Sequence, residues 1–385
     1  MSTGISAARY EERLGRARAA VGAGGHGALL IGVGPELEWL IGYAAVALER
    51  LTMLVIPASG RPTLVVPRLE VGAASAAPGT AAGLVELATW GETDDPFALV
   101  AGTLGARSAA GTVGSLLVSD GLRAAFLLRL QAALPTARFA LASALVSPLR
   151  QVKDAEEVEL LRAAAGAADR TVEAMIAGRL VGRTEADLAR EVRDRLVGEG
   201  HDNAEFWIVA GGPNSASPHH EVSDRVVRAG EPLLFDIGGR RAGYCSDITR
   251  TVWVAGAVDQ GPDDAFRRLH GLVEQAQAAG RAAIRPGVAL QDLDRAARAI
   301  IDAAGHAEHF FHRLGHGIGL EVHEDPYLVE GNGAALVAGN AFSVEPGIYL
   351  EGRYGARIED IAICTPTGGE TLNGVERTLL TVRGE

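Results

Sequence analysis

Short apolar runs alternate with amphipathic stretches along the first 150 residues of this 385-residue chain. Strands are predicted at Ala28–Ile31, Leu51–Ile56 and Thr63–Val66, because each run is short, apolar and bounded by Gly, Pro or Ser. Gly121–Leu134 is apolar enough to predict a buried helix. This alternation indicates an α/β domain. Since it contains few clustered His, Asp or Glu, we expect it to have a structural or dimerising role that helps to shape the cleft.

The pattern changes after Ser147-Pro148, where long helical stripes begin. A Ser, Thr or Asp followed three residues later by an acidic residue has the spacing of a capping box, and Gly commonly ends a helix. By these signals three helices are predicted: one capped by Asp154 and Glu157, one from Thr184 (with Asp187) to about Gly198, and one from Pro286-Gly287 to Gly305-His306. We therefore expect two domains, 1–148 and 149–385.

Two pairs of predicted strands each carry acidic residues at apolar positions. Asp236 interrupts the apolar strand Leu233–Ile237, and Asp247 lies on the returning strand Tyr244–Val254. A symmetric hairpin centred on Arg241-Ala242 would place the two aspartates directly opposite each other, with Cβ atoms roughly 5 Å apart. Carboxylates that close repel unless a cation lies between them.

The second pair of strands repeats this arrangement near the C-terminus. Ala341–Glu345 and Ala356–Ile363 predict a hairpin centred on Gly352, which brings Glu345 and Glu359 together. Arg357 would lie on the same face as Glu359. This hairpin predicts a second group of ionisable side chains at one point.

His316 has a glycine on each side, which we interpret as allowing a tight backbone turn that presents the imidazole to a site. His312 precedes it by four residues, as in half of a zinc-protease helix motif. Arg313 stands where that motif requires Glu, however, and the glycines oppose a helix. We therefore reject the helical zinc motif.

Composition narrows the range of functions. A net charge of −12 without a basic stripe argues against a nucleic-acid partner. Two cysteines give no disulfide framework and fit a reducing compartment. No apolar run reaches the ~18 residues of a membrane helix, and the N-terminus does not resemble a signal peptide. We expect a cytoplasmic protein without a membrane partner.

The acidic hairpins and the glycine-flanked histidine together predict one metal site. Its expected ligands, which hold two divalent ions, are Asp236, Asp247, His316, Glu345 and Glu359. Oxygen-rich ligation with one nitrogen suits manganese, our first choice, and equally permits cobalt, zinc or iron.

Five segments resemble the signature of the pita-bread metallopeptidases, the creatinase and methionine aminopeptidase group. They are Phe235–Gly238, Ser246–Thr251, Gly315–Gly319, Val344–Tyr349 and Arg357–Asp360. The first half of the chain more loosely resembles the creatinase-type N-terminal domain of Xaa-Pro aminopeptidases and prolidases. The resemblance implies an α/β (α+β) protein in which this domain precedes a catalytic domain with a curved antiparallel sheet and covering helices. It also implies a homodimer.

The resemblance further implies roles for individual residues. Asp247 and Glu359 would bridge the two metals, and a hydroxide between the metals would attack the scissile carbonyl, with Glu345 as proton acceptor. The further active-site residues that it implies are His219, His312, His323 and Arg357.

The activity implied is cleavage of the peptide bond before proline in a small peptide whose second residue is proline, by an Xaa-Pro aminopeptidase or Xaa-Pro dipeptidase. One alternative is a metal-dependent hydrolase or lyase of a non-peptide small molecule on the same fold, such as an ectoine-type hydrolase. A second, ranked below it, is a catalytically inactive peptide-binding module. Glu205 stands where members of the family tend to carry an aromatic residue, unless Phe206 or Trp207 takes that place, and so bears on the preference for proline.

Overall fold

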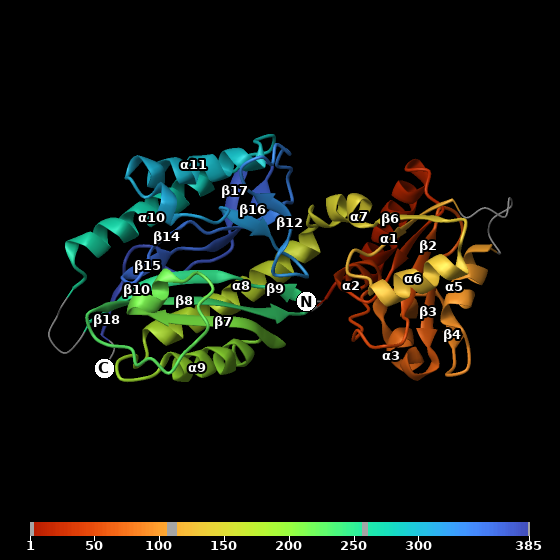
Figure 1. Ribbon diagram of the computed structural model, residues 1–385, viewed down its shortest axis with the longest axis horizontal. Helices are drawn as coiled ribbons and strands as arrows, with labels where there is room; N and C mark the ends of the chain where they lie inside the picture. Colours follow the sequence, from red (N-terminus) through yellow and green to blue (C-terminus); the bar gives the residue numbers. More distant parts are fainter. Residues whose placement is uncertain (1–3, 106–113, 256–260, 384–385) are drawn as a thin grey trace. The chain divides into compact units, whose positions relative to one another are not determined.

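The computed structural model describes residues 4–105, 114–255 and 261–383 and divides into two compact units, Met1–Arg150 and Gln151–Glu385 (Figure 1). The division follows α7 (Ser143–Arg150), so Ser147-Pro148 lies within a helix and not between the units. Among the described residues, no helix combines the length and apolar character needed to cross a membrane.

The first unit contains a six-stranded sheet in the order β4-β3-β2-β1-β5-β6. Neighbours β1–β2 and β2–β3 are antiparallel, and the other pairs are parallel. The strands are β1 (Ala28–Ile31), β2 (Met53–Pro57), β3 (Thr63–Pro67), β4 (Glu86–Trp90), β5 (Ser115–Val118) and β6 (Arg138–Leu141). The helices are α1 (Ala7–Ala23), α2 (Pro35–Ile41), α3 (Val71–Ala76), α4 (Pro78–Ala81), α5 (Pro96–Gly105), α6 (Ala124–Ala133) and α7. The three strands predicted from apolar runs are confirmed within two residues.

The prediction of a buried helix at Gly121–Leu134 was wrong in one respect. The helix is present as α6, but Leu130 is its only buried residue and Leu128 is 65% exposed. The helix covers the sheet with one stripe only, so its overall apolar character did not indicate complete burial.

The second unit contains helices α8 (Ala155–Ile176), α9 (Glu185–Gly198), α10 (Asp264–Ala282) and α11 (Leu290–Ala303). The predicted capping boxes at Asp154 and Thr184 are both present. No helix was predicted at α10, although Asp263 caps it by accepting a hydrogen bond from the Phe266 amide at 2.7 Å. In Figure 1, α9 lies along strands β7 and β8, whereas α10 and α11 lie together against the later strands.

Two largely antiparallel sheets form the rest of this unit. The first has the order β18-β10-β8-β7, with β9 paired to β8, and the second has the order β12-β11-β13-β16-β17. The strands of the first are β7 (Asn203–Gly211), β8 (Glu231–Arg241), β9 (Tyr244–Cys245), β10 (Ile248–Ala255) and β18 (Thr381–Arg383). Those of the second are β11 (Gly315–Gly317), β12 (Glu324–Leu328), β13 (Ala341–Val344), β16 (Asp360–Thr365) and β17 (Gly368–Thr371). A hairpin of β14 (Gly347–Leu350) and β15 (Tyr354–Arg357) stands beside them, and a bridge between Thr249 and Glu359 joins the two sheets.

The predicted register of the β8–β10 hairpin was wrong by two residues. Asp236 lies opposite Thr249 and not opposite Asp247. Asp247 precedes Thr249 by two residues, so it is displaced along the chain from the position opposite Asp236. The turn is formed by Ala242 and Gly243, whose φ values are 48° and 85°. A two-residue turn with positive φ at both positions matches the twist of the strands, and Gly243 favours it, which moves the centre away from Arg241-Ala242.

The register of the C-terminal hairpin was predicted correctly. Val344 lies opposite Asp360, and Gly347 lies opposite Arg357. Glu345 and Glu359 fall in the break between these pairs. Gly352 lies at the centre of the turn with a φ of 71°. Regular strand pairing is interrupted at both acidic residues, so their side chains do not have to follow the alternating directions of a regular strand.

Candidate metal centre

The five predicted ligands lie on strands of the two sheets or in the short segments directly beside those strands. Asp236 is on β8, Asp247 between β9 and β10, His316 on β11, Glu345 directly after β13, and Glu359 between β15 and β16. All five line one cavity of about 790 Å³. Residues separated by more than 100 positions in the chain therefore share one site.

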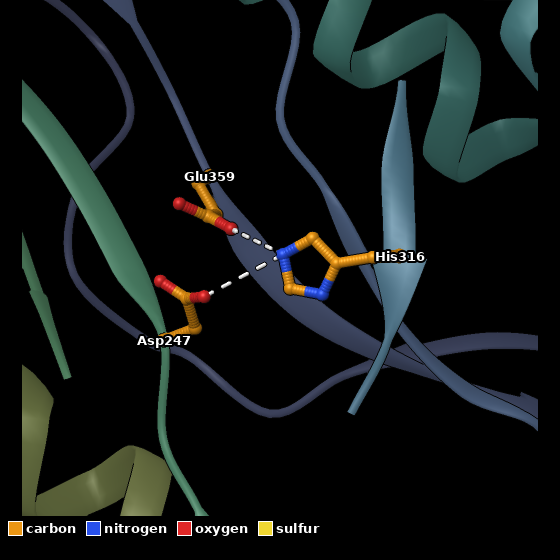
Figure 2. A group of neighbouring side chains, drawn as sticks. All are labelled: Asp247, His316 and Glu359. Carbon is orange, nitrogen blue, oxygen red and sulfur yellow. Dashed lines mark ion pairs between the residues drawn. The ribbon is translucent and has the colours of Figure 1, made fainter. Parts of the chain in front are cut away.

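Asp247, His316 and Glu359 form the closest group (Figure 2). Each offers one ligand atom, and these atoms lie within 4.8 Å of one another. His316 Nε2 is 3.6 Å from Asp247 Oδ2 and 4.0 Å from Glu359 Oε1. All three side chains are buried, and Figure 2 shows the two carboxylates turned toward the imidazole.

Glu345 and Asp236 complete the group from two sides. Glu345 Oε1 lies 3.2 Å from His316 Nε2 and accepts a hydrogen bond from Ser343 Oγ at 3.0 Å. Asp236 accepts a hydrogen bond from Arg357 Nη2. Four carboxylates thus face one space, and Arg357 and His316 are the cationic or ionisable groups in direct contact with them.

Two carboxylate oxygens at the centre, Asp247 Oδ1 and Glu359 Oε1, are buried without a hydrogen-bond partner among the described residues. Buried charges are normally paired or bound to metal. Burial and the neighbouring Glu359 raise the pKa of Asp247 well above its usual range. Burial and the charge of Glu345 do the same to the pKa of Glu359. This donor set fits divalent cations, which would supply the missing positive charge.

Glu345 differs from the other carboxylates. Burial disfavours its ionisation, but the hydrogen bond and charge of His316 outweigh this effect and lower the pKa of Glu345 to about 2. Its side chain is also more accessible, at 15%, than that of Glu359, at 2%. Glu345 is therefore an ionised carboxylate that opens toward the cavity.

The glycines beside His316 have a different role from the one predicted. His316 lies in strand β11, not in a tight turn. A Cβ atom at Gly315 would lie 2.0 Å from Ser343 O, and one at Gly317 would lie 2.3 Å from Asp325 O. The glycines allow β12 and β13 to approach on both sides.

The remaining predicted site residues also reach the cavity. His312 Nε2 is 3.0 Å from the Tyr349 hydroxyl, which accepts a hydrogen bond from Arg357 Nη1 at 2.8 Å. The ring of His323 packs edge-on against that of His316, with centroids 4.1 Å apart. His219 is exposed and lines the same cavity. Arg357 therefore links Asp236 to Tyr349 and His312.

Several supporting residues were missed by sequence reasoning. Thr249 Oγ1 donates a hydrogen bond to Glu359 Oε2 at 2.7 Å. Fully buried Asp360 accepts hydrogen bonds from Arg250, at 2.7 Å, and from Gln277 and Arg377, at 2.6 Å each, beside Glu359. The signal for Thr249 was its place on the same strand face as Asp247, whereas the partners of Asp360 come from distant segments.

His220, next to His219, has a defined partner. Its Nε2 lies 2.8 Å from Glu185 Oε2, and the Glu185 side chain is fully buried. Glu185 also accepts hydrogen bonds from Gly211 N and Asn214 Nδ2. These contacts hold the segment that carries His219.

Glu205 occupies the extra position of a bulge in β7. Ala204 pairs with Gly239 and Phe206 with Gly238, so Glu205 is left between them. Its carboxylate accepts a hydrogen bond from Arg240 Nε at 3.2 Å. Both Glu205 and Phe206 line the cavity, so the bulge presents an acid and an aromatic ring together.

Comparison with known proteins is consistent with this site. Residues 159–366 match the family described as Metallopeptidase family M24, and residues 13–152 match the Creatinase/Prolidase N-terminal domain. The chain belongs to metallopeptidase family M24. It is a metallopeptidase with a Creatinase/Prolidase N-terminal domain, which confirms the pita-bread resemblance.

Individual relatives are similar over nearly the whole chain. A probable dipeptidase PepE of Mycobacterium tuberculosis is 44% identical over 375 residues, covering 97% of this chain and 96% of the relative. The crystal structure of dipeptidase PepE from Mycobacterium ulcerans has a TM-score of 0.91 and 42% identity, covering 99% of this chain and 100% of that one. The crystal structure of a recombinant prolidase from Thermococcus sibiricus has a TM-score of 0.88 and 33% identity, covering 97% of this chain and 99% of that one.

Proposed function

We propose that this protein hydrolyses the peptide bond before proline in small peptides, as an Xaa-Pro dipeptidase or aminopeptidase. The observation that carries the proposal is the pair of unpartnered buried oxygens on Asp247 and Glu359, beside His316. In this proposal two divalent ions, with manganese as first choice, are held by Asp236, Asp247, His316, Glu345 and Glu359. Bound there, they would lower the pKa of a water and polarise the scissile carbonyl.

The other residues have roles that follow from their positions. Glu345 accepts the proton of the attacking water as the water oxygen bonds to the carbonyl carbon, and passes this proton to the leaving nitrogen as the C–N bond breaks. His219 and His323 donate hydrogen bonds to the oxygen on which charge develops. Arg357 positions Asp236, and Tyr349 holds His312.

Apolar side chains of the cavity support a proline substrate. Phe206, Ile208, Phe311 and Val322 line it together with the ionisable groups. A pyrrolidine ring is compact and apolar, so it suits a wall of this kind. The name of the similar prolidase points to a proline substrate, and the names of the similar dipeptidases point to short peptides.

We also propose a cytoplasmic homodimer in which the first unit takes part in dimerisation. Both cysteines, Cys245 and Cys364, are free and buried, as expected in a reducing compartment. Size-exclusion chromatography with light scattering would measure the oligomeric state.

The test of the proposed activity combines metal content with peptide hydrolysis. The protein is purified with manganese, its metal is counted by elemental analysis, and it is assayed on Ala-Pro, Ala-Pro-Ala, Ala-Ala and Pro-Ala. We expect about two metals per chain, as in other two-metal hydrolases, and cleavage restricted to bonds before proline. Bound metal with no cleavage of any peptide would refute the peptidase proposal, and equal cleavage of Ala-Ala would refute the preference for proline.

A further inference from the structure

Glu185 is a buried carboxylate that lies outside the metal centre. It is the first residue of α9, and its side chain is 0% exposed. A carboxylate without access to water is costly unless hydrogen-bond donors surround it. Its two oxygens accept hydrogen bonds from five groups: Gly211 N at 2.8 Å, Asn214 Nδ2 at 2.9 Å, His220 Nε2 at 2.8 Å, Ser223 Oγ at 2.7 Å and Ser223 N at 3.3 Å.

These donors keep Glu185 ionised. Burial disfavours the charged form of the carboxyl group, but the hydrogen bonds outweigh this effect and lower the pKa of Glu185 below its usual value. Hydrogen bonds to an ionised acceptor are stronger than those between neutral groups. Glu185 is therefore a fixed anion that gathers its donors around one point.

The donors all come from the segment 211–223, which carries His219 to the cavity. The segment begins with a 3-10 helix, η2 (Gly212–Ala216), but residues 217–222 form neither a helix nor a strand. Within the described residues, neither His219 nor His220 makes a backbone–backbone hydrogen bond. The position of His219 therefore depends on contacts made by side chains.

Two such contacts lie directly beside His219 in the chain. Arg357 Nη2 donates a hydrogen bond to Pro218 O at 3.4 Å, on the side of the metal centre. The His220 imidazole donates to Glu185, on the side of α9. His219 is thus exposed to the cavity between two neighbours that are both held.

We propose that Glu185 is a positioning residue for the reaction, which acts through His220 and Ser223 to hold His219 beside the scissile carbonyl oxygen. This inference rests on the proposed function, in which His219 donates a hydrogen bond to that oxygen, and deepens it. Such a donor stabilises the transition state only at the correct distance, and a displacement of about 1 Å can cost ~100-fold in rate. Because His219 is not a proposed metal ligand, loss of Glu185 should leave metal binding unchanged.

The test is a double-mutant cycle between Glu185 and His219. Hydrolysis of Ala-Pro is measured for the manganese-loaded native protein, Glu185→Gln, His219→Ala and the double variant, and manganese affinity is measured for each by calorimetry. Gln has the shape of Glu but turns an NH₂ group toward donors. We expect kcat to fall on the order of 10-fold in Glu185→Gln and ~100-fold in His219→Ala, with native manganese affinity in both. The double variant should be no slower than His219→Ala, because no side chain is then left for Glu185 to position.

A second pair of variants tests the same anchor if Glu185→Gln does not fold. His220→Gln can place an amide N–H near the position of the imidazole Nε2 and should keep most of the native kcat, whereas His220→Leu removes the donor and should lower kcat. The matched control is Glu191→Gln on the same helix, since the Glu191 carboxylate accepts hydrogen bonds from Arg183 and Arg195 instead. This control should have the native kcat.

Three results would overturn the proposal. They are a native kcat in Glu185→Gln or His220→Leu, losses in Glu185→Gln and His219→Ala that multiply in the double variant, and a loss of manganese affinity that parallels the loss of kcat. Failure of the proposed function would appear differently, as absent hydrolysis of Ala-Pro by the native protein.

Discussion

Replacing Asp247 by Asn should stabilise the metal-free protein while removing its response to metal. Asp247 Oδ1 and Glu359 Oε1 are buried and have no hydrogen-bond partner in the described parts of the chain, and an unsatisfied buried acceptor costs ~1–3 kcal/mol, more when charged. Asn has the same shape, carries no charge, and can donate a hydrogen bond to Glu359. We therefore expect the free energy of unfolding of the metal-free protein to rise by about 2 kcal/mol.

Metal should reverse the order of stability. A ligand at 100 times its Kd adds ~2.7 kcal/mol to the native state, and for a unit of this size each kcal/mol corresponds to a rise of ~2–4 °C in Tm. The native protein should gain about 5–10 °C with manganese. Asp247→Asn, which lacks an anionic ligand, should gain little and should not hydrolyse Ala-Pro.

The assay is thermal melting of both proteins in EDTA and in manganese, followed by hydrolysis of Ala-Pro. Glu351→Gln, in the exposed turn between β14 and β15, is the control and should behave like the native protein in both conditions. If the EDTA-treated variant melts at or below the EDTA-treated native protein, the carboxylate cluster is not under electrostatic strain and the reasoning is refuted. A native-like metal response in the variant would show that Asp247 is not a ligand.

Three further predictions concern stability, pH and specificity. Asp360→Ala should lower the free energy of unfolding by ~3–5 kcal/mol in urea denaturation, because it leaves buried Arg250 without its carboxylate. Burial lowers the pKa of His270 to about 4, so only the unfolded state takes up this proton as pH falls from about 6.5 to 4. The native protein should therefore lose up to ~3 kcal/mol of unfolding free energy as the pH falls over that range, and His270→Gln should not show this loss. The measurement is the unfolding free energy of both proteins as a function of pH. Glu205→Tyr should cost at most ~1 kcal/mol of stability, since its ion pair is partly exposed, and should raise the ratio of kcat/KM for Ala-Pro over Ala-Ala.

Each of these has a contrary outcome. For Asp360, a loss no larger than that of the exposed control Asp194→Ala would show that the buried network is not stabilising. For His270, an unchanged slope of stability against pH in the variant would assign the slope to other groups. For Glu205, an unchanged ratio would show that Phe206, its neighbour in the bulge, already supplies the aromatic wall.

Much of the fold and the choice of ligand residues followed from local patterns. The capping boxes at Asp154 and Thr184 mark helix starts because the cap and its partner are three residues apart. The C-terminal hairpin kept the register expected from Gly352. Asp236 in an apolar strand and His316 between glycines were anomalous in sequence, and anomalous positions in regular elements are expected at functional sites.

Other features depended on contacts that local patterns do not contain. Arg357 meets Asp236 across 121 residues of sequence, and Arg250 meets Asp360 across 110. The β8–β10 register was decided by the positive φ values at Ala242 and Gly243.

Local sequence is therefore sufficient to specify caps, strands and the chemical types of the candidate ligands, since these depend on interactions between near neighbours. The grouping of the candidate ligands around one point, and the pairing of Arg357 with Asp236, were decided only when the two sheets packed together. The physical reason is that the cost of burying a charge depends on which distant groups surround it.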